Sequence, residues 1–508
     1  MRVRQACFVS KGRFLKSLHQ ILNLLGQNTD GISDAMISAV HNDSRQVAAN
    51  DLFLAYPGAC LDGRDYIARA IAMGAAACLV EMLGFQPQHT YSVPVIAVPN
   101  LQDRVCDIAA FFMDEPATHL DLVGVTGTSG KSSCVHFIAQ ALGSLDCKTG
   151  VLGTIGNGVW PHLTASSLTT LDGIGVNRYL QHFLTDGVSR VAMEVSSHAL
   201  SQKRVYGLPF KIAVFTSLSH EHLDYHGSME AYARAKFELF HYPSLEAGVV
   251  NLDDHYGRLL VKERDDIRWL GYTVDGEFSV PGIDIIRASN VVCDQNGVSF
   301  DVDTPTVSLS ISLPLLGRFN IGNVLAVIGV LEHLGLTQEQ IQRAVSGLTT
   351  IEGRMQVLTT RGAPTVVVDY AHKPGALENA LGAVKQHFSG QVYCVFGCGG
   401  ERDRSKRPLM AKIAEQSAAQ VIVTSDNCRG EPLEQIWSDI RQGFSSMAHV
   451  KEIADRSDAI AYAVQSAGIG DIVFLAGMGH ELVSVDSEKS LLTDFEIAQR
   501  ALAKHSVE

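Results

Sequence analysis

The chain has 508 residues, too many for one hydrophobic core, so roughly three domains of ordinary size are expected. Apolar residues make up 46% and charged residues 19%, which excludes a disordered chain, and no apolar run approaches the roughly 20 residues that cross a bilayer. The 41 basic and 54 acidic residues give a net charge of −13, which argues against a nucleic-acid surface, and the ten scattered cysteines without a CxxC pair indicate reduced thiols in a cytoplasm.

The first domain is expected to span residues 1–118. Its N-terminus is basic, but charges interrupt every apolar run before Leu25, so we expect no signal peptide and instead a helix with apolar spacing from Phe14 to Leu25. Short apolar segments and a helix-like stretch then predict a small α/β domain. These segments are Asp51–Ala55, Cys78–Glu81 and Val95–Val98, and the helix-like stretch is Tyr66–Ala77.

A glycine-rich turn opens the central domain, which is expected over residues 119–347. Residues 123–133 read VGVTGTSGKSS, a short apolar run followed by glycines, Lys131 and a helix-like stretch. Backbone N–H groups and a helix start can surround a phosphate there, Lys131 can reach the β- and γ-phosphates, and Ser132 would lie beside Mg²⁺. The turn therefore predicts a nucleotide site.

The spacing of this turn differs from the general P-loop pattern. Gly124 lies one residue too early and Gly127 two residues too late, so the turn is interpreted as a variant P-loop. The alternative interpretation is a strand-to-helix turn with a solvated lysine.

Strand-like and helix-like segments alternate through the rest of the chain. In the central domain the pattern predicts a nucleotide-binding sheet flanked by helices, and after residue 347 it predicts a third, doubly wound α/β domain over residues 348–508. The strand-like runs of the central domain are Arg190–Glu194, Ile212–Thr216 and Gly248–Asn251. Those of the third domain are Thr365–Asp369, Gln391–Gly397, Gln420–Thr424 and Ile472–Ala476.

Polar residues follow three of these strands, at 194–198, 219–227 and 369–372. Ligands in parallel sheets bind beyond the carboxyl ends of the strands, where a carboxylate and an imidazole can bind Mg²⁺ directly or through water. For any one of these residues alone, the alternative is an ordinary hydrogen-bonded loop residue.

Six segments, in a fixed order along nearly the whole chain, are more specific together. They are residues 43–64 from DSR to DGR, the P-loop turn, MEVSSHALSQKR at 193–204, HLDYHG at 222–227 with Ala235 and Lys236, GRFNIGN at 317–323, and FGCGGERDRSKRP at 396–408 with DNCR at 426–429 and GMGHE at 477–481. This order resembles the Mur ligases, the ATP-dependent amide ligases that build the peptidoglycan stem peptide. Within that family the chain is most similar to the ligases that add the third residue, the UDP-N-acetylmuramoyl-tripeptide synthetases.

The resemblance implies three α/β domains: a small UDP-sugar-binding domain, a P-loop ATPase-like domain with a parallel sheet, and a Rossmann-like amino-acid-binding domain. It also implies a monomeric, cytoplasmic enzyme of cell-wall synthesis. ATP and Mg²⁺ would convert the free carboxylate of UDP-N-acetylmuramoyl-L-alanyl-D-glutamate into an acyl phosphate, because a carboxylate is a poor electrophile, and an amine of meso-2,6-diaminopimelate would attack it. Closure of the third domain would keep water away.

Carried over by position, the resemblance assigns residues to each ligand. The ATP contacts would be Gly127, Thr128, Ser129, Gly130, Lys131, Ser132, Ser133, Asn320, Asn323, Arg354 and Asp369. The contacts to the UDP-muramoyl dipeptide would be Asn42, Ser44, Ala59, Cys60, Leu61, Thr169, Thr170, Ser196, Gln202 and Arg204. The metal ligands would be Ser132, Glu194, His222 and Lys236, and the catalytic residues Lys131, Lys236, Glu194 and His222. Lys236 would be carbamylated, since Mg²⁺ repels an ammonium whereas a carbamate supplies an anionic oxygen.

The DNCR segment selects among the amino acids that the family uses. In the family a DNPR motif accompanies meso-diaminopimelate, and Arg429 can hold the distal carboxylate of that amino acid bidentately, whereas lysine would bring an ammonium against the guanidinium. The diaminopimelate contacts implied are Arg402, Asp426, Asn427, Cys428, Arg429, Gly477 and Glu481, of which Glu481 suits an ammonium group.

Several positions depart from the family pattern. Cys428 replaces the usual proline, Met478 replaces the lysine of GKGHE, Ser129 replaces asparagine, Leu168 stands where a polar residue is common, and residues 369–375 read DYAHKPG instead of DYAHTPD. Three alternatives therefore stay open: a paralogous ligase for another amino acid such as L-lysine or for another acceptor, a folylpolyglutamate synthetase, and a non-catalytic ATP-binding interaction protein.

Overall fold

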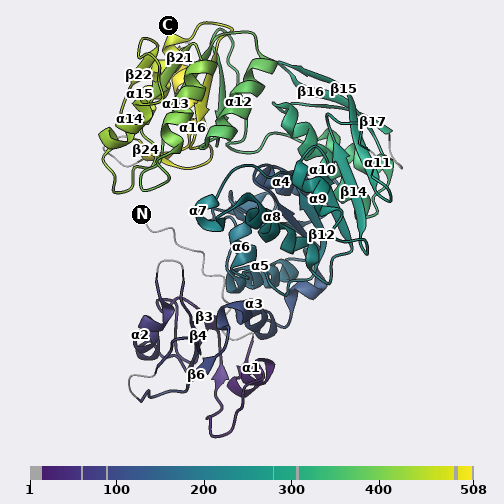
Figure 1. The fold of residues 1–508 in the computed structure, drawn as a ribbon, viewed down its shortest axis with the longest axis vertical. Coiled ribbons are helices and arrows are strands. Elements are labelled where there is room, and N and C mark those ends of the chain that lie inside the picture. The colour runs from purple at the N-terminus through teal and green to yellow at the C-terminus, as the bar shows by residue number, and fades with distance from the viewer. Residues whose placement is uncertain are drawn as a thin grey trace. The chain divides into compact units, whose positions relative to one another are not determined.

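The computed structural model describes residues 14–58, 61–86, 90–278, 280–304, 308–485 and 490–505. The predicted substrate contacts Ala59 and Cys60 lie outside these residues. The chain forms two compact units, each built from α/β layers (Figure 1). The first unit comprises Met1–Gly271, Val280–Ile283 and Gly329–Gly335, and the second comprises Tyr272–Ser279, Asp284–Ile328 and Leu336–Glu508. The predicted domain boundaries near residues 118 and 347 stay predictions.

A four-stranded parallel sheet forms the N-terminal part of the first unit, with strand order β3-β4-β5-β6. Its strands are β3 (Val40–His41), β4 (Leu52–Ala55), β5 (Ala77–Glu81) and β6 (Val95–Val98). Helix α2 (Ile67–Ala72) covers one face, and α1 (Leu18–Leu24) and α3 (Leu101–Phe112) cover the other. Because both faces are buried, the strands read as continuous apolar runs, and the predicted α/β fold is confirmed here.

Two helices of this part are shorter than the sequence pattern predicts. Helix α1 begins only after Ser17, whose side chain accepts a hydrogen bond from the N–H of Gln20, while the Gln20 side chain accepts one from the N–H of Ser17. Helix α2 ends at Ala72 because the chain turns at Gly74, which has a φ of +107°. A Cβ at Gly74 would lie 2.9 Å from the Cα of Ala49, so this turn requires glycine.

The second sheet of the first unit carries the glycine-rich turn. Its strand order within this unit is β10-β9-β8-β11-β7-β12-β13, and β8, β11, β7, β12 and β13 run parallel. The strands are β7 (Asp121–Thr126), β8 (Thr149–Leu152), β9 (Asn157–Val159), β10 (His162–Thr164), β11 (Arg190–Glu194), β12 (Phe210–Phe215) and β13 (Ala247–Asn251). The strand β14 (Arg268–Thr273), which is next to β13, contains residues of both units. The helices are α4 (Lys131–Gly143), α5 (Gly173–Thr185), α6 (Ser197–Ser201), α7 (Leu223–His226), α8 (Met229–Phe237) and α9 (His255–Leu260).

Helix α5 connects the two sheets of the first unit. The guanidinium of Arg178 donates to the carbonyl oxygen of Val40 at 3.0 Å, and its Nη2 lies 3.1 Å from Nδ1 of His41. A Cβ at Gly173 would lie 2.8 Å from the Cα of Cys106 in α3, so the two helix backbones approach as closely as glycine allows. These contacts place the loops of the first sheet beside the start of α5.

The second unit begins with three antiparallel strands that the sequence analysis did not predict. They are β15 (Asp284–Asp294), β16 (Gly297–Asp303) and β17 (Ser308–Leu313), and the helices α10 (Arg318–His333) and α11 (Gln338–Ser346) follow. Buried and exposed residues alternate along β17, which is the pattern of a half-buried strand. His387 of the following helical segment contacts these strands, because its Nδ1 lies 2.5 Å from the carbonyl oxygen of Asp294 in β15, and its Nε2 accepts from the N–H of Gly317 at 2.8 Å.

A six-stranded sheet forms the core of the second unit, with strand order β18-β19-β23-β20-β21-β22. The strand β18 pairs antiparallel and the other pairs are parallel. The strands are β18 (Gln356–Leu358), β19 (Thr365–Asp369), β20 (Val392–Phe396), β21 (Gln420–Val423), β22 (Val450–Glu452) and β23 (Ile472–Ala476), and a hairpin of β24 (Val483–Val485) and β25 (Ser490–Leu492) follows.

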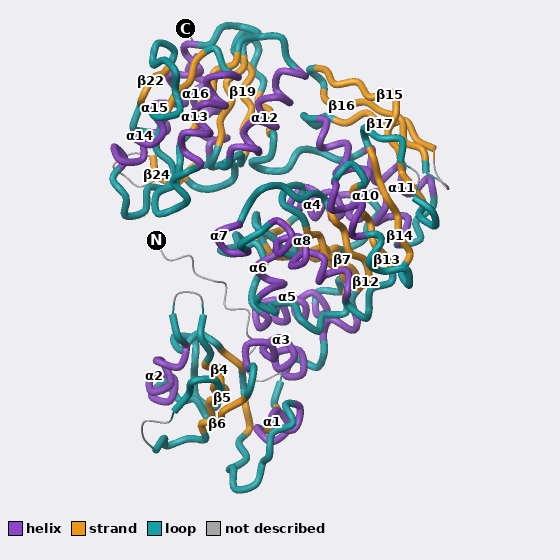
Figure 2. The backbone as a smooth tube through the Cα atoms, viewed as in Figure 1, coloured by secondary structure: helices purple, strands orange, loops and turns teal. Residues whose placement is uncertain are grey.

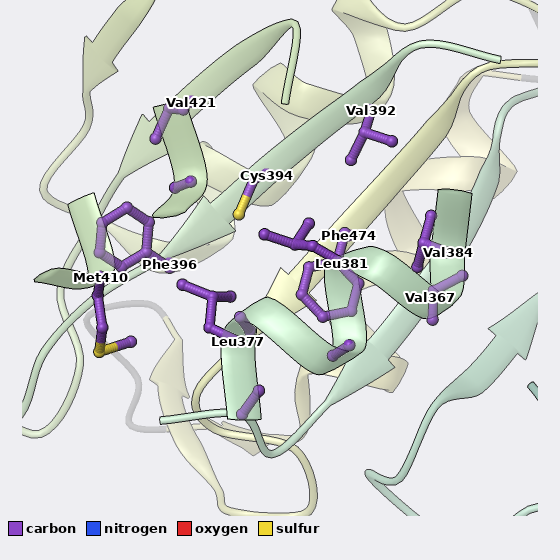
Figure 3. Close-up of a cluster of buried hydrophobic side chains, with 14 of the residues drawn as sticks. Val367, Leu377, Leu381, Val384, Val392, Cys394, Phe396, Met410, Val421 and Phe474 are labelled. Carbon is purple, nitrogen blue, oxygen red and sulfur yellow. The ribbon is translucent and has the colours of Figure 1, made fainter. Parts of the chain in front are cut away.

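Helices cover both faces of this sheet (Figure 2). One face packs against α12 (Pro374–His387), α13 (Lys406–Ser417) and α14 (Leu433–Arg441), and the other against α15 (Arg456–Ser466) and α16 (Asp494–His505). Figure 3 shows Leu377 and Leu381 of α12 packed with Phe474 of β23 and Phe396 of β20. The predicted doubly wound α/β arrangement is confirmed.

Among the helices in the described residues, none combines the length and the apolar character needed to cross a bilayer.

Candidate active site

The glycine-rich turn links β7 to α4, and two of its glycines have backbone angles that other residues rarely adopt. The φ of Gly127 is +145° and that of Gly130 is +85°. A Cβ at Gly127 would lie 1.9 Å from Oγ1 of Thr216, so only glycine fits. The 13-residue helix α4 begins at Lys131, with its first N–H groups at the turn. This combination of a glycine turn and a helix start suits a phosphate group.

Hydrogen bonds anchor the other residues of the turn to α8 and to the segment that follows β12, the strand beside β7 in the sheet. The hydroxyl of Thr128 lies 3.2 Å from that of Tyr232, and the N–H of Ser129 donates to Oγ of Ser217 at 3.3 Å. Ser133 belongs to the first turn of α4. The predicted phosphate loop, Gly127 to Ser133, therefore forms one continuous, anchored segment.

Lys131 and Lys236 converge on one atom of this turn. The Nζ of Lys131 donates to the carbonyl oxygens of Gly127 at 2.8 Å and Thr128 at 3.0 Å. Lys236, on α8, is only 1% exposed and donates to the same oxygen of Gly127 at 2.7 Å. Its Nζ also lies 4.7 Å from the ring centroid of Tyr232. Two cationic side chains thus make the turn attractive to anions.

Glu194 ends β11 with a buried carboxylate that accepts three hydrogen bonds. One oxygen accepts from the hydroxyl of Ser132 at 2.9 Å and from the N–H of Thr154 at 2.8 Å, and the other accepts from the Thr154 hydroxyl at 3.2 Å. A Cβ at Gly153 would lie 2.5 Å from this carboxylate, so a glycine makes room for it. The structure thus brings two of the four predicted metal ligands, Ser132 and Glu194, into direct contact.

His222 lies in a cluster of rings that begins where α7 starts. Its ring centroid lies 4.9 Å from that of His198 and 6.0 Å from that of Tyr232, and its backbone has a φ of +55°. His226 stacks on Tyr232 at 4.9 Å, and burial, together with the charges of His198 and Lys236, lowers the pKa of His226. The predicted ligands His222 and Lys236 therefore both border Tyr232.

The predicted set of four metal ligands stays a prediction. Within the described ranges, no three side chains of His, Cys, Asp or Glu lie together in a way that could hold a metal ion. The oxygens of Ser132 and Glu194 are nevertheless the hard ligands that Mg²⁺ takes alongside water and phosphate oxygens, so this pair fits the ion. The ammonium of Lys236 does not fit, because a cation repels it, and a carbamate on that nitrogen would.

Predicted contacts to the peptide end of the first substrate lie directly beside Glu194. The hydroxyl of Thr170 donates to the carbonyl oxygen of Glu194 at 2.8 Å and accepts from the N–H of Ser196 at 3.0 Å. The hydroxyl of Thr154 lies 3.1 Å from that of Thr169. Thr169 is thus linked through Thr154 to the Glu194 carboxylate, whereas Thr170 and Ser196 are linked to the backbone of Glu194.

Arg204 and Gln202 extend this cluster. Arg204 donates to the carbonyl oxygen of Thr170 at 3.0 Å and to the side-chain oxygen of Gln202 at 2.6 Å, and Gln202 donates to the hydroxyl of Tyr225 at 3.3 Å. Burial raises the pKa of Tyr56 in the N-terminal part, and the charge of Arg204 acts in the opposite direction.

One predicted contact of the N-terminal part, Asn42, is hydrogen-bonded to the second sheet's part of the unit. The amide of Asn42 donates to the hydroxyl of Tyr56 at 3.0 Å and to the carboxylate of Asp172 at 3.2 Å. Ser44 is buried, whereas Leu61 is 67% exposed. Asn42 thus connects the first sheet to Asp172, the residue that caps α5.

In the second unit, the loops that carry predicted residues follow four neighbouring parallel strands, β19, β23, β20 and β21. The carboxyl ends of these strands share one edge of the sheet, which is where a doubly wound fold binds ligands. Hydrogen bonds tie the loops together: the N–H of Gly477 donates to the carbonyl oxygen of Asp369 at 3.1 Å, and that of Gly400 donates to the carbonyl oxygen of Asn427 at 3.0 Å.

The guanidinium of Arg429 is held by backbone oxygens at this edge. Its Nη1 donates to the carbonyl oxygens of Gly400 at 2.7 Å and Asn427 at 3.3 Å. In the part of the chain that the structure describes, no carboxylate pairs with it. A Cβ at Gly399 would lie 2.9 Å from this Nη1 and 3.9 Å from Cγ of Arg402, so the two arginines flank the same glycine. The arrangement suits an anionic group.

Two of the positions that depart from the family pattern lie in well-packed surroundings. The thiol of Cys428 donates to the carbonyl oxygen of Asp426 at 3.4 Å, and a Cβ at Gly400 would lie only 2.0 Å from the carbonyl oxygen of Cys428. These contacts restrain the loop without a proline. Met478 is buried next to Gly477, whose Cβ position lies 3.2 Å from the carboxylate of Asp426.

Three further predicted residues of the second unit, Arg354, Asp369 and Glu481, each make a contact near β19. The hydroxyl of Tyr370 donates to Glu481 at 2.7 Å, and Cζ of Arg354 lies 4.4 Å from the ring centroid of Tyr370. The N–H of Met355 donates to the carboxylate of Asp369 at 2.8 Å. Burial raises the pKa of Asp369, and the charge of Arg354 opposes this shift.

Asn320 and Asn323 form a buried pair on α10. The amide of Asn320 donates to the carbonyl oxygen of Leu316 at 2.8 Å, and that of Asn323 donates to the side-chain oxygen of Asn320 at 2.9 Å. Both belong to the second unit, whereas the phosphate loop belongs to the first. Their predicted approach to adenine therefore stays a prediction, as does the reach of Arg354 and Asp369 toward ATP.

Comparison with known families decides where the chain belongs. Residues 36–112 match "Mur ligase family, catalytic domain", residues 125–331 match "Mur ligase middle domain", and residues 353–479 match "Mur ligase, glutamate ligase domain". The chain belongs to the Mur ligase family. It therefore has the three-domain α/β architecture of that family, as the sequence analysis expected.

The relatives of this Mur ligase extend over nearly the whole chain. A protein of Coxiella burnetii (strain RSA 493 / Nine Mile phase I) named UDP-N-acetylmuramoyl-L-alanyl-D-glutamate--2,6-diaminopimelate ligase is 44% identical over 489 residues, which are 96% of this chain and 99% of that protein. A Pseudomonas aeruginosa protein of the same name is 44% identical, and the alignment covers 93% of this chain and 96% of that protein. A solved structure of a ligase with this name has a TM-score of 0.66 at 34% identity. The match covers 92% of this chain and 95% of the chain in that structure.

Sequence reasoning assigned no role to three residues that contact predicted site residues of this Mur ligase. Thr154 bonds to Glu194, Asp172 bonds to Asn42, and Tyr370 bonds to Glu481. Thr154 lies two residues after β8, so a wider use of the strand-end rule could have included it, and Tyr370 belongs to the strand-end segment 369–372, where it was given no ligand. Asp172 carries no such signal beyond its place before a helix.

Proposed function

We propose that this Mur ligase is an ATP-dependent ligase that joins meso-2,6-diaminopimelate to UDP-N-acetylmuramoyl-L-alanyl-D-glutamate. The observation that carries the choice of amino acid is the guanidinium of Arg429, which backbone oxygens hold in place beside Arg402 and which no described carboxylate neutralises. Relatives named for this reaction, 44% identical over 96% of the chain, support the same choice.

The proposed chemistry has two steps. The γ-phosphoryl group of ATP passes to an oxygen of the free D-glutamyl carboxylate, which releases ADP and forms an acyl phosphate. The neutral amine of diaminopimelate then attacks the acyl carbon, the carbon–oxygen bond to phosphate breaks, and the nitrogen loses a proton. Lys131, at the phosphate loop, offsets the negative charges that meet in the first step.

Residues around Glu194 fit the metal and the end of the first substrate. Ser132 and Glu194 would hold Mg²⁺ with their oxygens, and the ion supplies positive charge at the phosphate oxygens when bound. Lys236, as a carbamate, would add an anionic oxygen, and His222 would complete the set. Thr170 and Ser196, which are hydrogen-bonded to each other, would orient the D-glutamyl end of the substrate. The hydroxyl of Thr170 also donates to the carbonyl oxygen of Glu194, which places this pair beside the proposed metal ligand.

The amino-acid site separates diaminopimelate from lysine by charge. Arg429 would pair with the distal carboxylate through two parallel hydrogen bonds, and Glu481 would accept the ammonium on the same carbon. The attacking amine must be neutral, so the distal amine is the one that carries charge in the bound amino acid. Lysine lacks the distal carboxylate and would bring its ammonium to the guanidinium of Arg429, which repels it.

The reaction belongs to peptidoglycan synthesis, and therefore to the maintenance of cell shape and to cell division. We place it in the cytoplasm and expect a monomer, because ATP and the UDP-linked precursor are both soluble small molecules. The predicted contacts need no second copy of the chain.

Two alternatives lead to different outcomes in the same assay. A folylpolyglutamate synthetase would not use a UDP-sugar, and a non-catalytic ATP-binding protein would not release ADP. Residues 36–112, which match a Mur ligase domain and contain Asn42 and Ser44, weigh against the first, and the presence of Lys131 with Glu194 weighs against the second.

The test is ADP release by the purified full-length chain with ATP, Mg²⁺, the UDP-muramoyl dipeptide and one amino acid. We expect release only when the dipeptide and diaminopimelate are both present, with a tripeptide product confirmed by its mass. Release without the UDP-linked dipeptide, or with glutamate and a folate in its place, contradicts the proposal.

A further inference from the structure

Tyr370 directly follows β19 and contacts two of the predicted binding residues. Its hydroxyl donates to a carboxylate oxygen of Glu481 at 2.7 Å, and Cζ of Arg354 lies 4.4 Å from the centroid of its ring. Glu481 is assigned to the amino acid and Arg354 to ATP. Tyr370 therefore contacts an amino-acid residue of the proposed site, Glu481, through its hydroxyl, and a proposed ATP residue, Arg354, through its ring.

Two glycines hold the loops that carry these residues against one another. Gly353 has a φ of +66°, and a Cβ there would lie 2.3 Å from the backbone nitrogen of His480. Gly479 has a φ of +53°, and a Cβ there would lie 2.9 Å from the carbonyl oxygen of Gly353 and 2.9 Å from Cβ of Tyr370. Neither position has room for a side chain, so the backbone itself fixes the surroundings of Tyr370.

The charges around Tyr370 leave its hydroxyl as a donor to Glu481. Burial and the Glu481 carboxylate raise the pKa of Tyr370, and the charge of Arg354 opposes them only in part. The His480 ring lies 5.1 Å from the Tyr370 ring, and burial and Arg354 lower its pKa to about 4. Burial lowers the pKa of His372, 4.6 Å away, to about 3. Both imidazoles are neutral near pH 7 and bring no competing cation.

From this geometry we infer that Tyr370 is a positioning residue, which orients the Glu481 carboxylate for the distal ammonium of the incoming amino acid. The inference rests on the proposed function, which assigns Glu481 to that ammonium. The hydroxyl fixes one carboxylate oxygen and leaves the other to accept the ligand, and without it the side chain of Glu481 samples more rotamers. The ring face serves Arg354 separately, so the hydroxyl alone governs the amino-acid step.

The variant Tyr370→Phe removes this hydroxyl and keeps the ring. We compare two amino acids that differ only at the distal carbon: meso-diaminopimelate and 2-aminopimelate, which keeps the distal carboxylate but lacks the distal amine. The KM for diaminopimelate should rise about tenfold, as expected for a lost hydrogen bond to a charged group. The KM for 2-aminopimelate and the KM for ATP should stay within about twofold of the wild-type values, because neither ligand uses the oriented carboxylate.

Tyr462 offers a matched control in the same unit. Tyr462 lies on α15, which contains none of the predicted binding residues. Its hydroxyl accepts from the side chain of Gln420 at 3.3 Å. The variant Tyr462→Phe also loses one hydroxyl from a tyrosine. It should leave all three KM values unchanged, which separates the loss of a particular hydrogen bond from the loss of any phenol.

A cycle with Glu481→Gln tests whether Tyr370 acts through Glu481. If it does, adding Tyr370→Phe to Glu481→Gln should raise the KM for diaminopimelate by less than about twofold further. Full additivity of the two changes, or an equal rise of KM for diaminopimelate and 2-aminopimelate, overturns the inference and leaves Tyr370 a structural residue. A wild-type enzyme that releases no ADP with diaminopimelate contradicts the proposed function instead, so the two failures are distinguishable.

Discussion

The side chains of Lys131 and Lys236 donate to one carbonyl oxygen, that of Gly127, at 2.8 Å and 2.7 Å. Of the two, Lys236 is the one that is only 1% exposed, and burial in general disfavours the charged form of an amine. A primary amine adds carbon dioxide only in its uncharged form, forming a nitrogen–carbon bond and losing a proton. The arrangement therefore supports modification of Lys236 rather than of Lys131, which is left to act on phosphate.

The first prediction concerns Lys131→Ala. Loss of a cation at the transferring phosphate should lower kcat by roughly 10²–10³-fold. Binding of the UDP-muramoyl dipeptide, measured by calorimetry, should stay near wild type, because its predicted contacts lie elsewhere. The control is Lys148→Ala, which removes an exposed lysine that donates to Asp186. Activity of Lys131→Ala close to wild type contradicts the assignment of the phosphate loop.

A second prediction concerns the carbamate on Lys236. Lys236→Ala should be nearly inactive and should regain part of its activity when a short carboxylate such as acetate is added, since that anion can replace the carbamate oxygen. Lys131→Ala should show no such rescue. When carbon-13 bicarbonate is added to the wild-type enzyme, its carbon-13 NMR spectrum should show a carbamate signal. An unmodified ammonium at Lys236, in a crystal of active enzyme grown near neutral pH with bicarbonate, is the result that contradicts it.

The strands could be predicted because their signals are local. The predicted runs Arg190–Glu194, Thr365–Asp369 and Ile472–Ala476 coincide with β11, β19 and β23, since strands buried on both faces are continuous apolar runs. The antiparallel strands between Asp284 and Leu313 escaped, because their exposed faces interrupt those runs. The period-two pattern of β17 was the available signal.

The pairings in the candidate site depend on contacts that no local pattern encodes. Lys131 and Lys236 meet at Gly127 although 105 positions separate them in the sequence, and Glu194 finds Thr154 across two neighbouring strands, β11 and β8. The order of the strands in the sheet determines which of these side chains come into contact, and the sequence analysis did not predict that order. Residue types at strand ends could be identified, but their partners could not.

The third prediction concerns pH and Glu431. Both oxygens of Glu431 accept from Arg407 at 2.7 Å, which, with the N–H of Glu401, lowers the pKa of Glu431 to about 2. A carboxyl whose pKa is lowered on folding stabilises the fold above its unfolded pKa, about 4.3, and this contribution is lost as the pH falls toward 2. Glu431→Gln should therefore lower Tm at pH 7 and differ progressively less from wild type below about pH 4.

The control for Glu431 is Glu378→Gln, an exposed glutamate on α12, which should leave Tm unchanged throughout. Calorimetric scans of both variants between pH 3 and pH 7 make the comparison. A difference between Glu431→Gln and wild type that is as large at pH 3 as at pH 7 contradicts the ion-pair account.

The fourth prediction concerns Arg429. Arg429→Ala should raise the KM for diaminopimelate, with a transition-state penalty of roughly 2–5 kcal/mol for the loss of a charge partner. ATP and UDP-muramoyl dipeptide affinities should barely change. Arg429→Lys should not restore full activity, because an ammonium lacks the planar fork that binds a carboxylate through two hydrogen bonds. Full activity of Arg429→Lys would mean that charge alone, without geometry, recognises the amino acid.

The most direct test of the central claim is the ratio of kcat/KM for meso-diaminopimelate to that for L-lysine, measured by ADP release with the wild-type enzyme. We expect diaminopimelate to be preferred by roughly 10⁴-fold or more, because lysine leaves the guanidinium of Arg429 without its carboxylate and adds a like charge. Comparable values for the two amino acids contradict the account, and the substitutions at Cys428 and Met478 would then mark a changed amino-acid site.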